Sequence, residues 1–326
     1  MHSSPQRRGK VTIETIKNTI DQLRENDNSL KKVVFSGGEP TLLHSLLFDA
    51  ITYCVKQGLN TRLETNAHWA TTRKKADGML GSLRNCGLSE IAYSLDDYHA
   101  SEVSAEKVLT AWYASKNKGF HRVLIANCHG HTSKFTPEFI RSLLDEAAAV
   151  VLDGQEIPSC TESQNGTGTR YLISSSGLQR MGRGRALAEE SVVYPDRQSS
   201  LNQRCPWASG NMVLSAGSHL IACSRINAHG NEFLDFGDVR NANAVDLFRL
   251  GEKRVVIQAM RKYGPWFLMN FVNSIATRSL FKSRYASVCE ICEDVMNIAE
   301  SRRILKECFP RFYTLYEIKQ KISPII

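Results

Sequence analysis

The feature that most constrains the fold is a repeated alternation of short apolar runs and longer helical patterns between residues 12 and 144. Each repeat takes roughly 20 to 30 residues, which suits a strand, a helix and their connections. The alternation therefore predicts parallel strands, in a doubly wound sheet or a barrel. Strands are predicted at 33–35, 60–65, 91–95, 123–126 and 171–173. Helices are predicted after Thr12, over 43–55, 72–86 and 105–118, and from Pro137.

Polar residues follow four of these predicted strands, at 36–39, 64–68, 94–99 and 127–129. One polar residue at a strand end is more often a turn former than a functional group. In a parallel barrel, however, the carboxyl ends of the strands meet at the same side of the molecule. Four polar strand ends in succession therefore predict a binding site there.

The first of these strand ends carries the sequence Phe35-Ser36-Gly37-Gly38-Glu39-Pro40-Thr41. Glycines allow the backbone to approach a ligand closely, and a proline suits the first turn of a helix. A small ligand bound by main-chain groups and by the carboxylate of Glu39 is one interpretation. The other is a tight strand-to-helix turn with an acid on the surface.

Composition favours a soluble globular protein with one large or two ordinary domains, since 42% of the 326 residues are hydrophobic and 23% are charged. The most apolar stretch, near 266–275, is too short to span a bilayer. No secretory sequence opens the chain, so a cytoplasmic protein without a membrane partner is expected. The net charge is +8, but the basic residues are not interleaved with aromatic residues, so a nucleic-acid partner is not expected.

The nine cysteines are expected to be metal ligands or buried apolar residues, because disulfides are rare in the cytoplasm. Cys289 and Cys292 have the Cys-x2-Cys spacing of a metal site, and a predicted hairpin bearing Cys205 and Cys223 supplies two more thiolates. Four thiolates suit zinc or an iron-sulfur cluster, and spacing alone favours zinc. A structural zinc would make the chain a non-enzymatic binding module.

The Gly-Gly-Glu-Pro sequence resembles the motif that binds the methionine moiety of S-adenosylmethionine in radical S-adenosylmethionine (radical SAM) enzymes. The resemblance implies an α/β fold, a partial (β/α)6 TIM-like barrel. It also implies reductive cleavage of S-adenosylmethionine to a 5′-deoxyadenosyl radical, with flavodoxin or ferredoxin as reductant. The cofactor-binding residues that it implies are Gly37, Gly38, Glu39, Pro40, Thr65, Asn66, Ser94 and Asp96.

Asp97 and His99 have no counterpart in that motif set and are the candidate catalytic residues, as a proton donor and acceptor pair. The alternative for Asp97 is that it caps a helix. Glycine and arginine alternate at 181–186, which allows close approach to an anion, and a Gly-Arg-Ala sequence in this region is familiar from the same superfamily.

The C-terminal part is similar to the auxiliary-cluster domains called SPASM or twitch, through Cys205, Gly217, Cys223, Gly237-Asp238-Val239 and the distant Cys-x2-Cys. The step from Gly217 to Cys223 is one residue longer than usual, and cysteines for a second auxiliary cluster are absent. The resemblance implies one auxiliary four-iron four-sulfur cluster at Cys205, Cys223, Cys289 and Cys292, and a peptide or protein substrate. The predicted domains are 1–190 and 191–326.

One motif of the family is missing from the sequence. Radical SAM enzymes bind their catalytic cluster with Cys-x3-Cys-x2-Cys after the first barrel strand, whereas the first cysteine here is Cys54 and no strand precedes the first helix. The sequence is therefore expected to start just downstream of that loop. The chain as given is expected to be inactive, and an upstream extension to supply the strand and the three thiolates.

Overall fold

A computed structural model describes residues 9–26, 30–145, 149–153, 168–205, 207–208 and 210–322. The chain divides into two units. We call the part from Thr12 to Leu178 the sheet unit, and the part from Gln179 onward, with residues 9–11, the cysteine unit. The predicted domain boundary after residue 190 therefore lies inside the cysteine unit.

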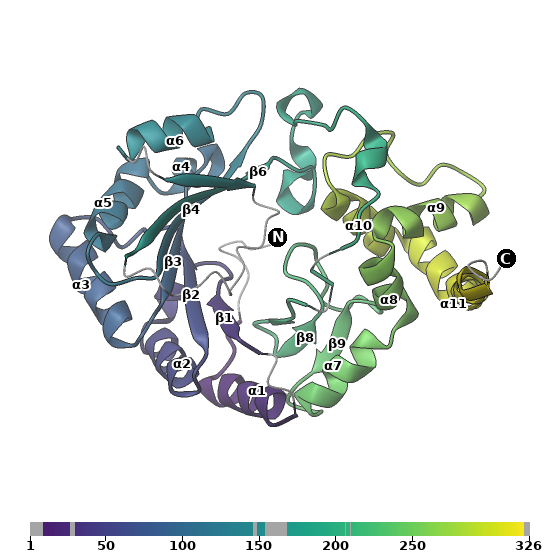
Figure 1. Cartoon of the computed structure of the whole chain (residues 1–326), viewed down its shortest axis with the longest axis horizontal. Helices are drawn as coiled ribbons and strands as arrows, with labels where there is room; N and C mark the ends of the chain where they lie inside the picture. The colour runs from purple at the N-terminus through teal and green to yellow at the C-terminus, as the bar shows by residue number, and fades with distance from the viewer. Residues whose placement is uncertain are drawn as a thin grey trace. The chain divides into compact units, whose positions relative to one another are not determined.

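The sheet unit contains six parallel strands in the order β1-β2-β3-β4-β6-β5 (Figure 1). The parallel sheet confirms the expectation of an α/β fold and is consistent with a partial TIM-like barrel. The strands are β1 (Lys32–Phe35), β2 (Asn60–Thr65), β3 (Glu90–Ser94), β4 (Arg122–His129), β5 (Val150–Asp153) and β6 (Arg170–Gly177).

Strand β5 was not predicted, since the sequence from residue 151 to 169 indicates a loop. Residues 154–167 lie outside the described part of the chain. β5 is short, forms an edge of the sheet and pairs with β6, and Val150 is half exposed. It therefore lacks the long buried apolar run from which a central strand is predicted.

The first helix of the sheet unit precedes β1 and the others come after strands, and the helices line the outer side of the curved sheet (Figure 1). Their starts follow from capping, because Thr72 accepts a hydrogen bond from the Lys75 amide and Thr136 from the Phe139 amide. The helices are α1 (Ile13–Asn26), α2 (Ser45–Lys56), α3 (Arg73–Asn85), α4 (Asp97–Glu102), α5 (Ala105–Ser115) and α6 (Pro137–Leu143). Between the helices and the sheet, Leu63, Ile91 and Trp112 are fully buried.

A buried carboxylate lies at the amino end of the sheet, opposite the predicted site. Glu90 begins β3, and its Oε atoms lie 2.7 Å from Lys32 Nζ, 2.6 Å from Arg62 Nη2 and 3.4 Å from Arg122 Nη1. Burial raises the pKa of Glu90, but attraction to Arg62 and Lys32 lowers this pKa by a larger amount. The pKa of Glu90 therefore lies below its usual value. This cluster joins residues of four neighbouring strands, β1 to β4.

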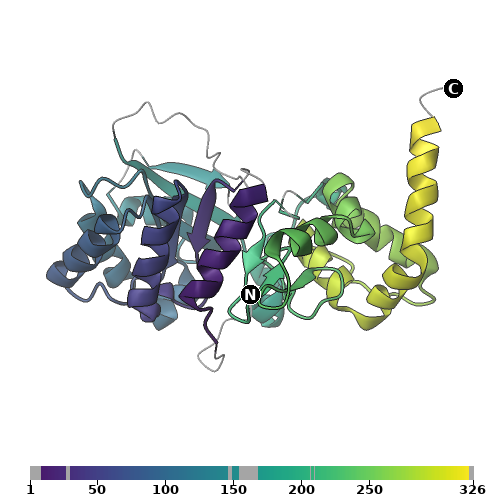
Figure 2. The ribbon, with the colours of Figure 1, turned by 90° about the horizontal axis from the view of Figure 1, so that it is seen from below.

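The cysteine unit combines a small antiparallel sheet with helices. The predicted hairpin is confirmed: β7 (Val213–Leu214) and β8 (His219–Ile221) flank a turn at Ser215–Ser218, and β9 (Asp235–Asp238) adds a third strand. The helices are α7 (Ala244–Glu252), α8 (Val255–Lys262), α9 (Pro265–Ile275), α10 (Val288–Asn297) and α11 (Ala299–Ile322). Figure 2 shows the last turns of α11 projecting beyond the other helices of this unit. Among the described residues, no helix is both long and apolar enough to cross a bilayer.

Candidate cofactor site and four-cysteine centre

The carboxylate of Glu39 joins the ends of two neighbouring strands. It caps a short 3-10 helix, Pro40–Leu43, and Oε1 accepts hydrogen bonds from the amide and hydroxyl of Thr41 (3.2 and 2.6 Å). The hydroxyl of Thr65, the last residue of β2, donates to the same oxygen at 2.9 Å. The amide of Asn66 donates to Oε2 at 2.8 Å. The structure therefore brings Glu39, Thr65 and Asn66 together, as their sequence motifs predict.

The turn before Glu39 depends on glycine. Gly37 has φ +136°, a backbone conformation that residues with a Cβ rarely adopt, and no heavy atom lies within 4 Å of the Cβ positions of Gly37 and Gly38 among the described residues. This leaves open space beside the turn. Ser36 donates to Glu64 Oε2 at 2.6 Å and so adds a second link between the ends of β1 and β2.

The next strand end carries Ser94 and Asp96. Ser94 is the last residue of β3 and lies opposite Ala126 of β4, at the same carboxyl end of the sheet as Thr65. Asp96 is the N-cap of α4 and accepts from the amides of Tyr98 (3.0 Å) and His99 (2.9 Å). The alternative that Asp97 caps this helix is wrong, because Asp96 makes the capping bonds.

The structure shows different hydrogen-bond partners for the two members of the candidate pair, Asp97 and His99. His99 Nδ1 lies 2.8 Å from Asp96 Oδ2, and its side chain is half exposed. Asp97 accepts from the amides of Lys134 and Phe135, at 3.1 and 3.3 Å, and so holds the loop that follows β4. The carboxylate in contact with His99 Nδ1 is therefore one that the motif assigns to the cofactor.

A further set of hydrogen-bonded polar side chains lies at the carboxyl ends of the strands, and the sequence predicted only part of it. Asn127 Nδ2 donates to the carbonyl of Leu95 at 2.9 Å, and its Oδ1 accepts from the Ser175 hydroxyl at 2.6 Å. His129 Nδ1 lies 2.9 Å from the same hydroxyl. Ser175 was missed because the predicted strand ended at Ile173, whereas β6 continues to Gly177.

The four cysteines of the predicted metal centre are close neighbours in the cysteine unit. Burial raises the pKa of Cys292 well above its usual value, and the thiolates of Cys205, Cys223 and Cys289 raise it further. Burial likewise raises the pKa of Cys289 to about 12, although the Arg225 guanidinium opposes this. Without a metal Cys289 and Cys292 would hold protonated thiols, and a bound metal has to displace those protons.

The four thiols are a suitable ligand set for more than one metal centre. A tetrahedral zinc with Zn–S bonds of 2.3 Å binds four thiolates about 3.8 Å apart. A four-iron cluster binds each thiolate to a different iron atom, which requires wider spacing. By their chemistry the four cysteines could hold either group.

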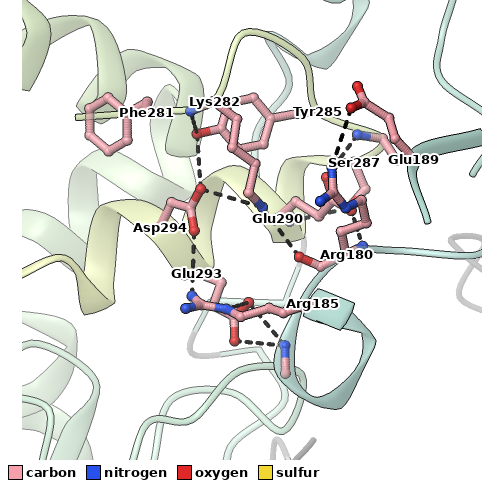
Figure 3. A network of polar contacts seen from close by, with 12 residues as sticks. Arg180, Arg185, Glu189, Phe281, Lys282, Tyr285, Ser287, Glu290, Glu293 and Asp294 are labelled. Atoms are coloured by element: carbon pink, nitrogen blue, oxygen red, sulfur yellow. Dashed lines mark hydrogen bonds and ion pairs between the residues drawn. The ribbon is translucent and has the colours of Figure 1, made fainter. Parts of the chain in front are cut away.

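The 3-10 helix Gly182–Ala186 contains the alternating glycines and arginines, and acids of α10 bind it (Figure 3). The Gly182 amide donates to both carboxylate oxygens of Glu293, at 2.9 and 3.0 Å. Arg185 Nε lies 3.3 Å from Glu293 Oε2, and Arg185 Nη2 lies 3.4 Å from Asp294 Oδ1. The anion that this segment approaches is therefore a carboxylate of the same chain.

Glu290 and Asp294 extend this network around the start of α10 (Figure 3). Glu290 accepts from the amides of Arg180 and Ala286. Asp294 Oδ2 accepts from the Tyr285 hydroxyl at 3.1 Å and lies 3.5 Å from Lys282 Nζ. These acids were not predicted, although their place beside Cys289 and Cys292 could have indicated them. The helix that carries two of the four thiols is thus held by polar contacts of its buried acids.

Comparison with known proteins supports the sheet unit's assignment. Residues 2–141 match the model of the radical SAM superfamily. These residues are a radical SAM superfamily domain. The match covers the Gly-Gly-Glu-Pro turn and the carboxyl ends of β1 to β4.

No curated protein matches the chain significantly. A solved structure described as the crystal structure of BtrN in complex with AdoMet and 2-DOIA is similar to 81% of this chain and 80% of that one, at 11% sequence identity and a TM-score of 0.43.

Radical SAM domains bind S-adenosylmethionine and a four-iron four-sulfur cluster, so the fit of the Glu39 site to the methionine moiety can be tested on its hydrogen bonds. Oε1 of Glu39 accepts the bonds from Thr41 and Thr65, whereas Oε2 accepts the Asn66 amide. A carboxylate oxygen has two lone pairs, so Oε2 retains capacity for an ammonium group. The radical SAM domain therefore presents a preoriented acceptor at the expected position.

Proposed function

We propose that this protein is a radical SAM enzyme that modifies a peptide or protein and carries one auxiliary four-iron four-sulfur cluster at Cys205, Cys223, Cys289 and Cys292. The observation that carries the proposal is the pair of bonds from Thr65 and Asn66 to the Glu39 carboxylate, within the residues that match the family. When bound, S-adenosylmethionine and its cluster supply a 5′-deoxyadenosyl radical. The peptide substrate rests on the SPASM resemblance of the four cysteines.

In this proposal the chain's own residues bind and orient the cofactor. Glu39 accepts the amino group of the methionine moiety at Oε2, while Thr41 and Thr65 fix the orientation of its carboxylate. Ser94 and Asp96, at the adjacent strand end, would hold the ribose. Asp97 positions the loop at Lys134, and His99 Nδ1 lies 2.8 Å from Asp96 Oδ2. A proton donor role for His99 is part of the proposal.

Binding of S-adenosylmethionine to the full chain tests the first half. Calorimetry is done with wild type, Glu39→Gln and Glu106→Gln, an exposed glutamate of the same unit. We expect at least tenfold weaker binding for Glu39→Gln and no change for Glu106→Gln, because the carboxylate of Glu39 is the proposed acceptor of the amino group. Equal affinity of the two variants contradicts the assignment.

Metal analysis tests the second half. After anaerobic reconstitution, iron and acid-labile sulfide are measured in wild type, Cys289→Ala and Cys86→Ala, a partly exposed cysteine remote in sequence from the four. We expect both elements to fall in Cys289→Ala alone. Zinc without sulfide in the wild type rules out the auxiliary cluster and leaves the first half standing.

A further inference from the structure

A third group of metal-binding side chains lies in the small sheet of the cysteine unit. Among the described residues, His219, His229 and Asp235 each offer a ligand atom, and these atoms all lie within 4.8 Å of one another. His219 begins β8, Asp235 begins β9, and His229 lies in the connection between them. No cysteine belongs to this group, so it is separate from the four-cysteine centre.

The carboxylate of Asp235 is held in one orientation. Its side chain is 8% exposed and accepts hydrogen bonds from the amides of Gly230 (2.7 Å) and Gly237 (3.0 Å). His219 Nδ1 lies 2.9 Å from both of its oxygens. Since the position of the carboxylate does not depend on His229, two of the three ligand atoms are fixed before any ion arrives.

The second imidazole is close and has room to adjust. The ring centroids of His219 and His229 are 4.4 Å apart, with an interplanar angle of 39°, and His229 is exposed. A Cβ on Gly217 would lie 3.2 Å from His229 Nε2, closer than an ordinary contact. The absence of a side chain at Gly217 therefore preserves the space that the His229 ring occupies.

We propose that His219, His229 and Asp235 bind one divalent transition-metal ion of the zinc class. Two imidazoles and one carboxylate are a ligand set of zinc and of other first-row metals, with the fourth position left to water. Zn–N bonds of 2.0–2.1 Å place tetrahedral ligands about 3.4 Å apart, so ligand atoms that lie up to 4.8 Å apart must approach each other by up to about 1.4 Å. The exposed His229 supplies that movement, and the proton on the ligating imidazole nitrogen leaves to solvent.

The proposed ion would link two strands of the small sheet. It would join both ends of the connection between β8 and β9, and Cys223 lies in that connection. The group cannot be recognised in the sequence, because its three residues lie on two strands and a loop and have no spacing that is typical of a metal site. The pairing of β8 with β9, whose register shifts between Leu220 and Ile221, brings the two strands together.

Cobalt(II) titration tests the proposal without reference to activity. The full chain, prepared without a histidine tag and reconstituted anaerobically, is titrated with Co²⁺ alone, followed by calorimetry and absorption. We expect one equivalent that produces no sulfur-to-metal charge-transfer band, because the ligands are nitrogen and oxygen. Affinity for that equivalent should fall at least tenfold in His229→Gln and Asp235→Asn, and stay unchanged in His131→Gln, an exposed histidine of the sheet unit.

The outcomes separate the alternatives. Unchanged Co²⁺ affinity in both His229→Gln and Asp235→Asn, or a charge-transfer band for every bound equivalent, overturns the proposal and leaves an ordinary histidine–aspartate contact. If Asp235→Asn fails to fold, His229→Gln decides alone, because His229 is exposed and its circular dichroism is expected to match wild type.

Discussion

Replacing Glu90 by glutamine should destabilise the sheet unit strongly. The substitution keeps the size of the side chain but removes the carboxylate that Lys32, Arg62 and Arg122 share. Glu90 is 6% exposed, so water replaces little of the lost attraction. Removing one partner of a buried ion pair costs about 3–5 kcal/mol, and we expect about 4 kcal/mol here because three cations share the carboxylate.

The effect is measured by thermal and urea unfolding followed by circular dichroism and by the fluorescence of the fully buried Trp112. With 2–4 °C per kcal/mol for a unit of this size, the melting temperature should fall by roughly 10 °C. The double variant Glu90→Gln, Lys32→Met should recover part of the loss, because it removes one of the cations that share the Glu90 carboxylate. Asp77→Asn, at a partly exposed position, serves as control and should change little.

The pH dependence gives the reasoning a second test. Because the pKa of Glu90 is lowered in the folded protein, its stabilisation is complete above the unfolded pKa of about 4.3 and is lost as pH falls through the folded value. The difference between wild type and Glu90→Gln should therefore shrink below about pH 4. A loss under about 1 kcal/mol at pH 7, or a difference that does not shrink as the pH falls below about 4, refutes the prediction.

Two further predictions concern single positions. Gly264→Ala should destabilise the cysteine unit and lower its iron content. The φ of Gly264 is +86°, and the added Cβ would lie 1.7 Å from the carbonyl oxygen of Gln203, two residues before Cys205. Gly81→Ala is the control and should have neither effect, because no heavy atom lies within 4 Å of its Cβ position. Cys54 should react with iodoacetamide at pH 8 about a thousandfold more slowly than an ordinary thiol, because burial raises its pKa to about 12. Mass spectrometry of the native protein checks this, and rapid labelling at Cys54 contradicts it.

The sequence predicted those parts of the fold that depend on local patterns. The strands ending at Phe35, Thr65 and Ser94 have apolar runs followed by turn residues, so their positions came within one residue of the structure. Strand β5 depends on pairing with β6, a contact that no local pattern encodes. Much of the cysteine unit's helical content, including α7 to α9, was also missed.

In the candidate site, too, the sequence predicted the residues of local motifs but not their contacts. Motifs identified Glu39, Thr65 and Asn66, but not that the first accepts hydrogen bonds from the other two. The His99 contact with Asp96, rather than with Asp97, depends on the start of α4 at a particular residue. Such contacts follow from side-chain direction in three dimensions, which spacing alone does not determine.

Helix α10 has a consequence for how its sequence can vary. In ten residues it presents two thiols to one set of neighbours and three acids to another, and eight of the ten residues are buried. With 3.6 residues per turn, inserting one residue after Cys289 would rotate everything beyond it by about 100°. Cys292 would then leave the other thiols, and Glu293 and Asp294 would turn away from Arg185. Among homologues that keep both sets of contacts, the length of this segment should therefore be invariant, even where its apolar residues are exchanged.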